Sequence, residues 1–220
     1  MDSSTEFANL ASLFADPTRS EMLLAMMDGR AFPVSELAAM AHVSLPTASH
    51  HLAILVEGGI VDVLQQGRHR YHRLAGPHVA SLIEQLAVLA NSTTPIRKPT
   101  AGQRLLMDGR VCYNHLAGHL GVGLRQSLEV QGQIQVDNDR YVLTESGMQF
   151  FADFGLDLRD QSFGKLCLDW TERVPHIGGK LGSALFQLFL QREWIARGDI
   201  PRQIRVTKIG KARFHELFQF

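Results

Sequence analysis

The stretch that decides the fold runs from residue 44 to residue 55 and reads SLPTASHHLAIL. Ser44 is a suitable N-cap, and Pro46 lies in the first helical turn, where the backbone needs no amide donor. Apolar residues then recur at spacings of four and three, so they share one helical face. They are Ala48, Leu52 and Leu55. The pattern predicts a helix that buries this face and leaves polar side chains outside.

The residues before this helix predict its setting. Asp16 and Pro17 favour the start of an earlier helix, and residues 36–41 favour a short one that ends at the tight turn His42-Val43. A short helix, a tight turn and a second helix with small polar residues at its start place side chains in the major groove of DNA. We therefore predict a recognition helix over residues 44–57. Its expected DNA-contacting residues are Ser44, Pro46, Thr47, Ser49, His50 and His51.

A β-hairpin is predicted next, with strands at residues 60–64 and 71–74 and a basic tip at residues 65–70. In this setting the hairpin is a wing. The expected contacts come from Arg68, His69, Arg70 and Tyr71, with both arginines beside the phosphate backbone. Three neighbouring side chains are expected to be solvated or to face phosphate. They are Asp62, His69 and His72.

Charge does not by itself indicate a DNA-binding protein. Lys and Arg total 22, as do Asp and Glu, and the first ninety residues hold five arginines against nine acidic residues. Any DNA contact must therefore depend on a local basic patch. Three of the five arginines lie within residues 68–73.

The order of these motifs resembles the ArsR/SmtB family of transcription regulators over about the first ninety residues. The matching segments are residues 16–19, 35–38, 49–55, 59–61 and 67–71. The resemblance implies a winged helix-turn-helix that binds operator DNA as a homodimer. It also implies a dimer seam made by helices over about residues 5–14 and 77–90. The apolar residues expected there are Phe7, Leu10, Phe14, Val79, Leu82, Ile83, Leu86 and Leu89.

The metal sites common in that family are missing. Where many members carry Cys-x-Cys on the third helix, this chain has Pro33 and Ser35. The fifth helix offers only His78 and Glu84, too few ligands for a closed tetrahedral site. We therefore expect any effector to act elsewhere.

Residues 91–103 are polar and bounded by proline, which predicts a linker. Beyond it, HLAGHLG at residues 115–121 returns as HIGGKLG at residues 176–182, and each copy is expected to open a helix. Turn regions at residues 133–143 and 198–206 follow, and then Thr144 or Thr207 as the cap of a final helix. The aromatic and aliphatic residues of the final helices are Phe150, Phe151, Phe154, Phe214, Leu217 and Phe218. The predicted fold is mainly α with β hairpins: a winged helix-turn-helix (1–90), a linker (91–103) and a duplicated helix-wing-helix domain (104–220).

The two cysteines leave several alternatives open. Each precedes a repeated histidine, Cys112 on the same predicted helical face as His115, and Cys167 ahead of His176. Together these four residues suit zinc or another soft metal ion. Either thiol could instead be a redox-reactive group, or both could be ordinary buried residues. An organic effector could also bind among polar and aromatic groups. These are Asp169, Trp170, Glu172, Arg173 and His176.

The functional prediction is a transcription repressor that binds an inverted-repeat operator as a homodimer and is released by an effector sensed in the C-terminal half. One alternative is a thiol- or metal-responsive sensor at the cysteine and histidine pairs. Another is a protein-interaction module with a vestigial DNA-binding domain. No dinucleotide-binding, P-loop or nucleophile-elbow motif supports an enzyme. The N-terminus lacks the features of a signal peptide, and no apolar run approaches membrane-spanning length, so a cytoplasmic protein without a membrane partner is expected.

Overall fold

The computed structural model describes the chain except for residues 1–2, 94–97, 154–155, 157 and 159–162. Phe154, expected in a final helix, lies outside the described residues. The chain divides into two compact units, Met1–Ile83 and Glu84–Phe220. The division falls inside one helix, ahead of the segment predicted as a linker.

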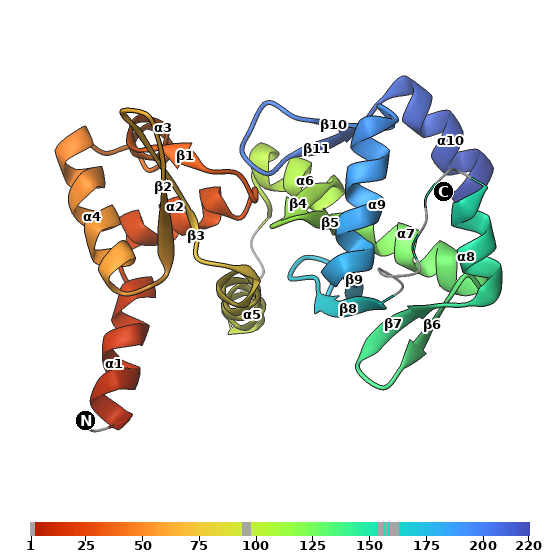
Figure 1. Ribbon diagram of the computed structural model, residues 1–220, viewed down its shortest axis with the longest axis horizontal. Coiled ribbons are helices and arrows are strands. Elements are labelled where there is room, and N and C mark those ends of the chain that lie inside the picture. The colour runs from red at the N-terminus through yellow and green to blue at the C-terminus, as the bar shows by residue number, and fades with distance from the viewer. Residues whose placement is uncertain (1–2, 94–97, 154–155, 157, 159–162) are drawn as a thin grey trace. The chain divides into compact units, whose positions relative to one another are not determined.

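The first unit has the element order of a winged helix-turn-helix (Figure 1). Its elements are α1 (Ser3–Phe14), α2 (Pro17–Met26), β1 (Phe32–Pro33), α3 (Val34–Met40), α4 (Leu45–Glu57), β2 (Val61–Gln66), β3 (His69–Leu74) and the start of α5 (Pro77–Thr93). Both predicted N-caps are confirmed: the Asp16 carboxylate accepts from the Arg19 amide, and the Ser44 hydroxyl accepts from the Thr47 amide. The predicted inward face of α4 is buried. Its core residues are Ala48, Leu52 and Leu55.

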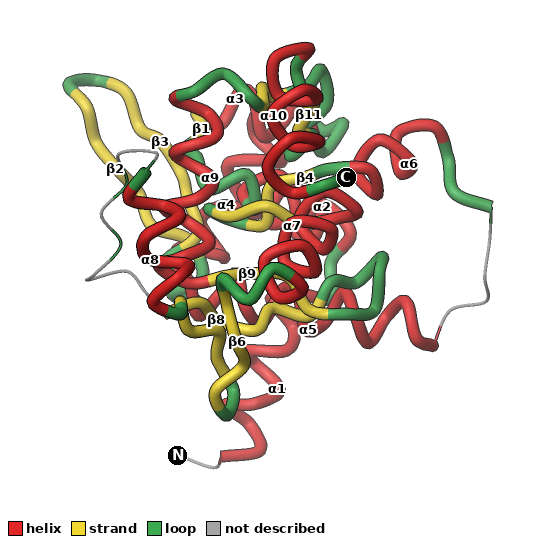
Figure 2. The backbone as a smooth tube through the Cα atoms, turned by 90° about the vertical axis from the view of Figure 1, so that its right-hand side faces the viewer, coloured by secondary structure: helices red, strands yellow, loops and turns green. Residues whose placement is uncertain are grey.

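The hairpin is longer than predicted. Strands β2 and β3 pair from Val61↔Leu74 to Gln66↔His69, so the turn is only Gly67 and Arg68. Gly67 has a φ of 59°, a conformation that glycine adopts without the penalty of a Cβ. The short strand β1 pairs with the other side of β3, which gives the order β1-β3-β2. Figure 2 shows the β2–β3 hairpin projecting from its unit and ending in this turn.

The second unit begins with the last part of α5 and contains five helices after it among the described residues. Its helices are α6 (Ala101–Asp108), α7 (Gly118–Val130), α8 (Glu145–Ala152), α9 (Gly179–Gln191) and α10 (Lys208–Phe218). Its strands are β4 (Arg110–Cys112), β5 (His115–Ala117), β6 (Ile134–Asp137), β7 (Arg140–Leu143), β8 (Phe163–Leu168), β9 (Pro175–Gly178), β10 (Ile195–Arg197) and β11 (Ile204–Val206). The sheets are β6-β7-β8-β9, β4-β5 and β10-β11. One core joins the two halves of the unit, and its large side chains include Tyr141, Phe151, Phe186, Phe189 and Phe214.

One element order occurs twice in this unit: hairpin, helix, hairpin, helix. The caps predicted for the two final helices are confirmed, because the Thr144 hydroxyl accepts from the Gly147 amide and the Thr207 hydroxyl from the Gly210 amide. A common origin of the two halves stays a prediction.

The repeated motifs at residues 115–121 and 176–182 do not begin in helices, so that expectation is wrong. His115 lies in β5 and His176 in β9, and α7 and α9 begin only at Gly118 and Gly179. The physical reason is backbone hydrogen bonding: β4 and β8 occupy the backbone groups of β5 and β9 in antiparallel ladders. The expectation that Cys112 and His115 share a helical face fails for the same reason.

The two halves pack reciprocally at a pair of glycines. A Cβ on Gly121 of α7 would lie 2.4 Å from the Leu116 carbonyl oxygen and 3.6 Å from the Cβ of His176. A Cβ on Gly182 of α9 would lie 2.1 Å from the Ile177 carbonyl oxygen and 3.0 Å from the Cβ of His115. Only glycine lets each helix approach its strand this closely. The helix of each half therefore packs against the histidine of the other half.

None of the helices in the described ranges combines the length and apolar character needed to cross a membrane.

Candidate functional site

The exposed face of α4 carries the polar residues expected to contact DNA. Ser49 and His50 are exposed, and so are Pro46 and Thr47 at the start of the helix. The hydroxyls of Ser44 and Thr47 lie 2.8 Å apart, so the cap also orients the threonine side chain. Small polar groups on a rigid helix, with apolar residues beneath them, are the arrangement that base reading requires.

His51 is placed differently from its neighbour. It is half-buried, and its Nδ1 lies 3.6 Å from Oδ1 of Asp16, the N-cap of α2. The His51 side chain therefore contacts the scaffold of the first unit as well as bordering the polar face. Its contact with DNA stays a prediction.

The wing presents its positive charge at the tip. Arg68 in the turn and Arg70 on β3 are exposed, as is His69 between them. Arg73, farther from the tip, faces Asp62 across the hairpin, with 3.8 Å between Nη2 and Oδ2. The charge of Arg73 is thus partly offset, and Arg68 and Arg70 stay the predicted phosphate ligands.

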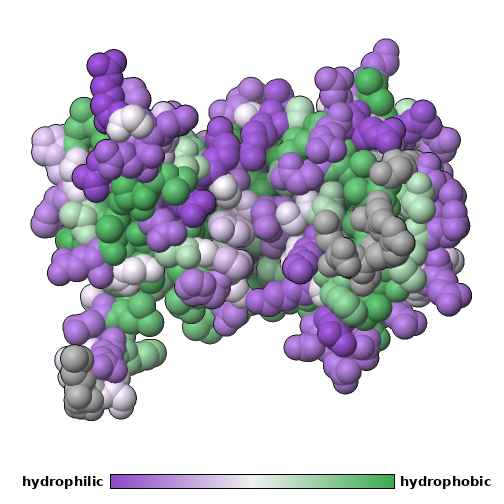
Figure 3. Space-filling view, viewed as in Figure 1, coloured by the Kyte–Doolittle hydropathy of each residue, from purple (hydrophilic) through white to green (hydrophobic). Residues whose placement is uncertain are grey.

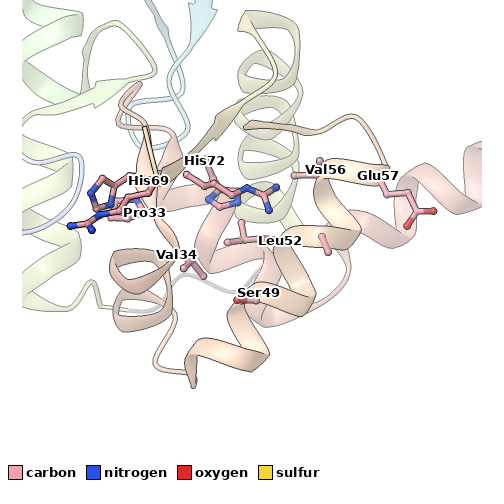
Figure 4. Close-up of a pocket in the computed structure, with 11 residues that line it drawn as sticks. Pro33, Val34, Ser49, Leu52, Val56, Glu57, His69 and His72 are labelled. Atoms are coloured by element: carbon pink, nitrogen blue, oxygen red, sulfur yellow. The ribbon is translucent and has the colours of Figure 1, made fainter. Parts of the chain in front are cut away.

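A groove of about 590 Å³ lies between α4 and the wing (Figure 4). Ser49, Leu52 and Val56 line it from the helix, and Arg68 and Arg70 line it from the hairpin. Polar and basic groups therefore face one concave surface. This surface, made by α4 and the β2–β3 hairpin, is the one predicted to contact DNA, and we call it the DNA-binding face.

His72 corrects the expectation of a solvated side chain, because it is only 8% exposed and lies at the floor of the groove between α4 and the hairpin. On β3 it lies opposite Val63 of β2 and Phe32 of β1. Alternation along the strand turns it inward, since its neighbours Tyr71 and Arg73 point to the other face. Burial lowers its pKa below the ordinary value of 6.5, and the charge of Arg70 acts in the same direction.

This burial predicts a pH dependence of stability. Between the lowered pKa and 6.5 the unfolded chain binds a proton at His72 that the folded chain does not, so the free energy of unfolding decreases as pH falls below 6.5. In His72→Gln we expect the free energy of unfolding of the first unit to lose this dependence on pH. Urea unfolding monitored by far-UV circular dichroism at several pH values measures it. The matched control is His69→Gln, an exposed histidine on the same strand, which should keep the dependence. An unchanged pH profile in His72→Gln would contradict the assignment.

The second site is a cluster of two cysteines and two histidines in the second unit. Cys112 faces His115 across β4 and β5, and Cys167 faces His176 across β8 and β9. We call these four residues the Cys/His cluster. Cross-strand partners are neighbours whatever the length of the hairpin loop, which explains the unequal sequence spacings of the two pairs.

Strands β5 and β9 lie side by side and bring the two pairs together. The Nε2 atoms of His115 and His176 are 3.1 Å apart, and the two Sγ atoms are 4.0 Å apart. All four potential ligand atoms lie within 4.8 Å of one another. Cys112 and both histidines are buried, and Cys167 is partly buried.

Each histidine has a polar neighbour behind its ring. Oδ1 of Asn114 accepts from Nδ1 of His115 at 3.1 Å, and Oδ2 of Asp169 lies 3.1 Å from Nδ1 of His176. Both contacts favour a ring proton on Nδ1, and the hydrogen bond between the two Nε2 atoms then needs a second proton on one ring, which the raised pKa of His176 assigns to His176. Asn114 lies in the two-residue turn of the β4–β5 hairpin, and Asp169 directly follows β8.

Asp169 is the centre of a buried polar network. Its carboxylate pairs with the guanidinium of Arg110 at 2.9 Å, and both side chains are fully buried. It also accepts from the amide of Gly118 at 2.7 Å and from the amide and hydroxyl of Thr171. The Arg110 guanidinium lies 4.8 Å from the ring centroid of Trp170. This network fixes the position of the carboxylate behind His176.

In the cluster and at Asp169, the pKa values of neighbouring groups are shifted in opposite directions. Burial would raise the pKa of the Asp169 carboxyl, but His176 and Arg110 outweigh it and hold that pKa far below the usual range. Burial would lower the pKa of His176, but Asp169 and Cys167 raise it to about 9. The pKa of Cys167 is lowered by the hydrogen bond from Cys112, whereas that bond and burial raise the pKa of Cys112. Burial lowers the pKa of His115.

The structure thus brings together some of the residues predicted to bind an organic effector. Asp169 and His176 adjoin, and Trp170 stacks on Arg110, whereas the side chain of Arg173 is exposed. Sequence reasoning missed Asn114 and Arg110. The turn at Tyr113-Asn114 was recognisable only once Cys112 and His115 were read as cross-strand partners. A single arginine far from Asp169 in the chain carries no local signal.

The fold and the DNA-binding face define a winged helix-turn-helix DNA-binding regulator. The chain belongs to the ArsR family: the family described as "Bacterial regulatory protein, arsR family" matches residues 16–63, and one HTH-type regulator is similar along 95% of the chain. The HTH-type transcriptional regulator YdfF of Bacillus subtilis is 40% identical over 215 residues, 95% of each chain. The biofilm growth-associated repressor of Agrobacterium fabrum is 38% identical over 82 residues, 37% of this chain and 69% of that one.

Among solved structures, the cadmium metal-sensor CMTR of Mycobacterium tuberculosis is 31% identical, with a TM-score of 0.33. The match covers 42% of this chain and 93% of that one.

Proposed function

We propose that this ArsR-family regulator is a cytoplasmic homodimeric repressor that binds an inverted-repeat operator and releases it when an effector acts on the Cys/His cluster. The observation that carries the proposal is the DNA-binding face. There Ser49 of α4 lines one wall of a groove whose other wall carries Arg68 and Arg70, and His50 is the exposed residue that follows Ser49 on the helix. The helix supplies sequence choice and the arginines supply affinity for phosphate.

Exposed apolar residues on two helices support the dimer. On α1, Phe7 is 73% exposed and Leu10 is 42% exposed. On α5, Leu89 is 60% exposed and Leu86 is 40% exposed, whereas Val79 and Ile83 of the predicted seam are buried within the chain. Figure 3 shows hydrophobic surface over α1. Large apolar side chains in water favour association, and a twofold dimer would set two copies of α4 on one face of DNA.

The contacts of Arg202 support a link between the effector site and α5. Its Nε donates to the carbonyl of Val111, the residue before Cys112, and its Nη2 pairs with the Glu84 carboxylate at 2.9 Å. Arg202 and Glu84 are both buried. A shift of β4 at Cys112 would therefore move the partner of Glu84 on α5, the helix assigned to the dimer seam. Movement of that seam would alter the spacing of the two copies of α4, and half-site spacing determines operator affinity.

The test is a gel-shift titration of the full chain on its own promoter at moderate salt. We expect a shift that needs both half-sites, since one copy of α4 reads each half. Absence of a shift on any promoter fragment would overturn the repressor assignment and favour a protein-interaction module. A shift of equal affinity on one half-site would overturn the dimeric mode.

His50 allows a sharper test of sequence reading. We expect His50→Ala to reduce discrimination between the operator and a sequence with one substituted base pair by about tenfold, because one base contact is worth roughly 1–3 kcal/mol. Its affinity for nonspecific DNA should not change. His78→Ala, at an exposed histidine of α5, is the control. Equal discrimination by His50→Ala and the native chain would remove His50 from the reading surface.

A further inference from the structure

We propose that the second unit binds one zinc-type divalent metal ion in a tetrahedral site made by Cys112, His115, Cys167 and His176. The site deepens the proposed function by giving the effector a chemical class, and it rests on that function only for its consequence at the operator. It lies outside the helices that carry the usual metal ligands of ArsR regulators, where this chain has Pro33, Ser35 and His78.

The distances within the cluster match the donor set. Zinc bonds of about 2.3 Å to sulfur and 2.0–2.1 Å to nitrogen give tetrahedral edges of about 3.8 Å between sulfurs and about 3.3 Å between nitrogens. The corresponding distances here are 4.0 Å between Sγ atoms and 3.1 Å between Nε2 atoms. The four atoms lie within 4.8 Å of one another, whereas the sulfur–nitrogen edge of such a tetrahedron is about 3.6 Å, so the widest pair has to close by up to about 1 Å on binding.

The surroundings orient the ligands as a metal site requires. Asn114 and Asp169 contact the Nδ1 atoms, which directs the Nε2 atoms of His115 and His176 toward each other. Such outer contacts fix the ring tautomer and strengthen the ligand. Gly178 leaves room for this arrangement, since a Cβ there would lie 3.2 Å from Nε2 of His115 and 3.3 Å from the Cβ of Cys167.

Charge also balances in this buried setting. Two thiolates neutralise a divalent ion, and Arg110 neutralises Asp169, so the loaded site has no net charge. Binding forms four metal–ligand bonds, and the protons that the thiols and imidazoles lose in becoming ligands pass to solvent, with no change of oxidation state. Hard ions such as Mg²⁺ and Ca²⁺ prefer oxygen ligands, which this donor set lacks.

The first experiment measures Zn²⁺ binding to the reduced full chain in competition with a chromophoric chelator. We expect one ion per chain, and loss of at least a hundredfold in affinity for Cys112→Ser and Cys167→Ser. His215→Gln, at an exposed histidine of α10, should bind as the native chain does. Cobalt as a probe should give the visible bands of a tetrahedral ion and a thiolate charge-transfer band that weakens in each serine variant.

A milder variant tests the site without replacing any ligand, so that weaker binding can be distinguished from misfolding. Asn114→Ala removes the contact behind His115 and leaves all four ligands, so we expect about tenfold weaker zinc binding with unchanged circular dichroism. The proposal is overturned if Zn²⁺ binds equally well to Cys112→Ser, or if both thiols titrate freely in the presence of equimolar Zn²⁺. Formation of a Cys112–Cys167 disulfide with no metal binding would instead assign the cluster to redox sensing.

Operator binding separates the two proposals. We expect Zn²⁺ to lower operator affinity at least tenfold in the native chain and to leave Cys167→Ser unaffected. If the ion loads the cluster and operator affinity stays the same, the metal site stands and the regulatory role of the cluster fails. If no ion loads and the operator is still bound, the DNA-binding function stands and the metal site fails.

Discussion

Arg110→Met is expected to lower the free energy of unfolding of the second unit by about 3–5 kcal/mol. The substitution removes the guanidinium from beside the fully buried carboxylate of Asp169 and leaves His176 as its charged neighbour, and breaking a buried pair from one side has costs of this size. It also removes the hydrogen bonds from Arg110 to the Leu106 carbonyl and the Thr171 hydroxyl. The result should be the largest destabilisation of any single arginine substitution in this unit.

Tryptophan fluorescence reports this effect directly, because both tryptophans, Trp170 and Trp194, lie in the second unit. Urea unfolding followed by fluorescence should shift strongly in Arg110→Met. The control is Arg213→Met, which breaks a pair with Glu216 whose side chains are about half exposed, so we expect less than about 1 kcal/mol. Similar midpoints for the two variants would show that the buried pair contributes little.

The double variant Arg110→Met with Asp169→Leu tests whether Asp169 has a structural role beyond its pair with Arg110. When a buried pair does nothing else, replacing both partners is often neutral. Here Asp169 also accepts from the amides of Gly118 and Thr171, which would lose their acceptor. We therefore expect the double variant to remain destabilised.

Arg68→Ala with Arg70→Ala is expected to weaken binding to every DNA sequence. Loss of two phosphate contacts should reduce the slope of log affinity against log salt by about 1.8, which at about 0.1 M salt corresponds to roughly 60-fold weaker binding. Discrimination between operator and nonspecific DNA should change little, because phosphate contacts carry no sequence information. The effect is large because the first ninety residues hold only five basic side chains.

Fluorescence anisotropy titrations at several salt concentrations measure this slope. Arg73→Ala is the matched control on the same hairpin, and its slope should differ little from that of the native chain because Asp62 already offsets the Arg73 charge. A native slope in the double variant would mean that the wing does not contact phosphate.

The first unit was predictable from sequence because its signals are local. A helix cap, an apolar stripe and a hairpin turn with glycine each act over fewer than ten residues, and Ser44, Leu52 and Gly67 identify them, although the predicted turn was longer than the observed one. The burial of His72 was missed, since the face of β3 that His72 shares with Leu74 is buried only when the sheet packs in the folded unit.

The sequence also indicated the four residues of the Cys/His cluster, through the repeated histidine motif, but it assigned them to helices. Only tertiary structure decided that Cys112 pairs with His115, and Cys167 with His176, across antiparallel strands, and that β5 and β9 bring the pairs together. The reason is physical. The packing of β5 against β9 and the burial of Arg110 against Asp169 join residues more than fifty positions apart, and no local pattern of side chains encodes such contacts. The sequence by itself determined a winged helix with a basic tip, whereas the tertiary structure decided where two thiols and two imidazoles meet.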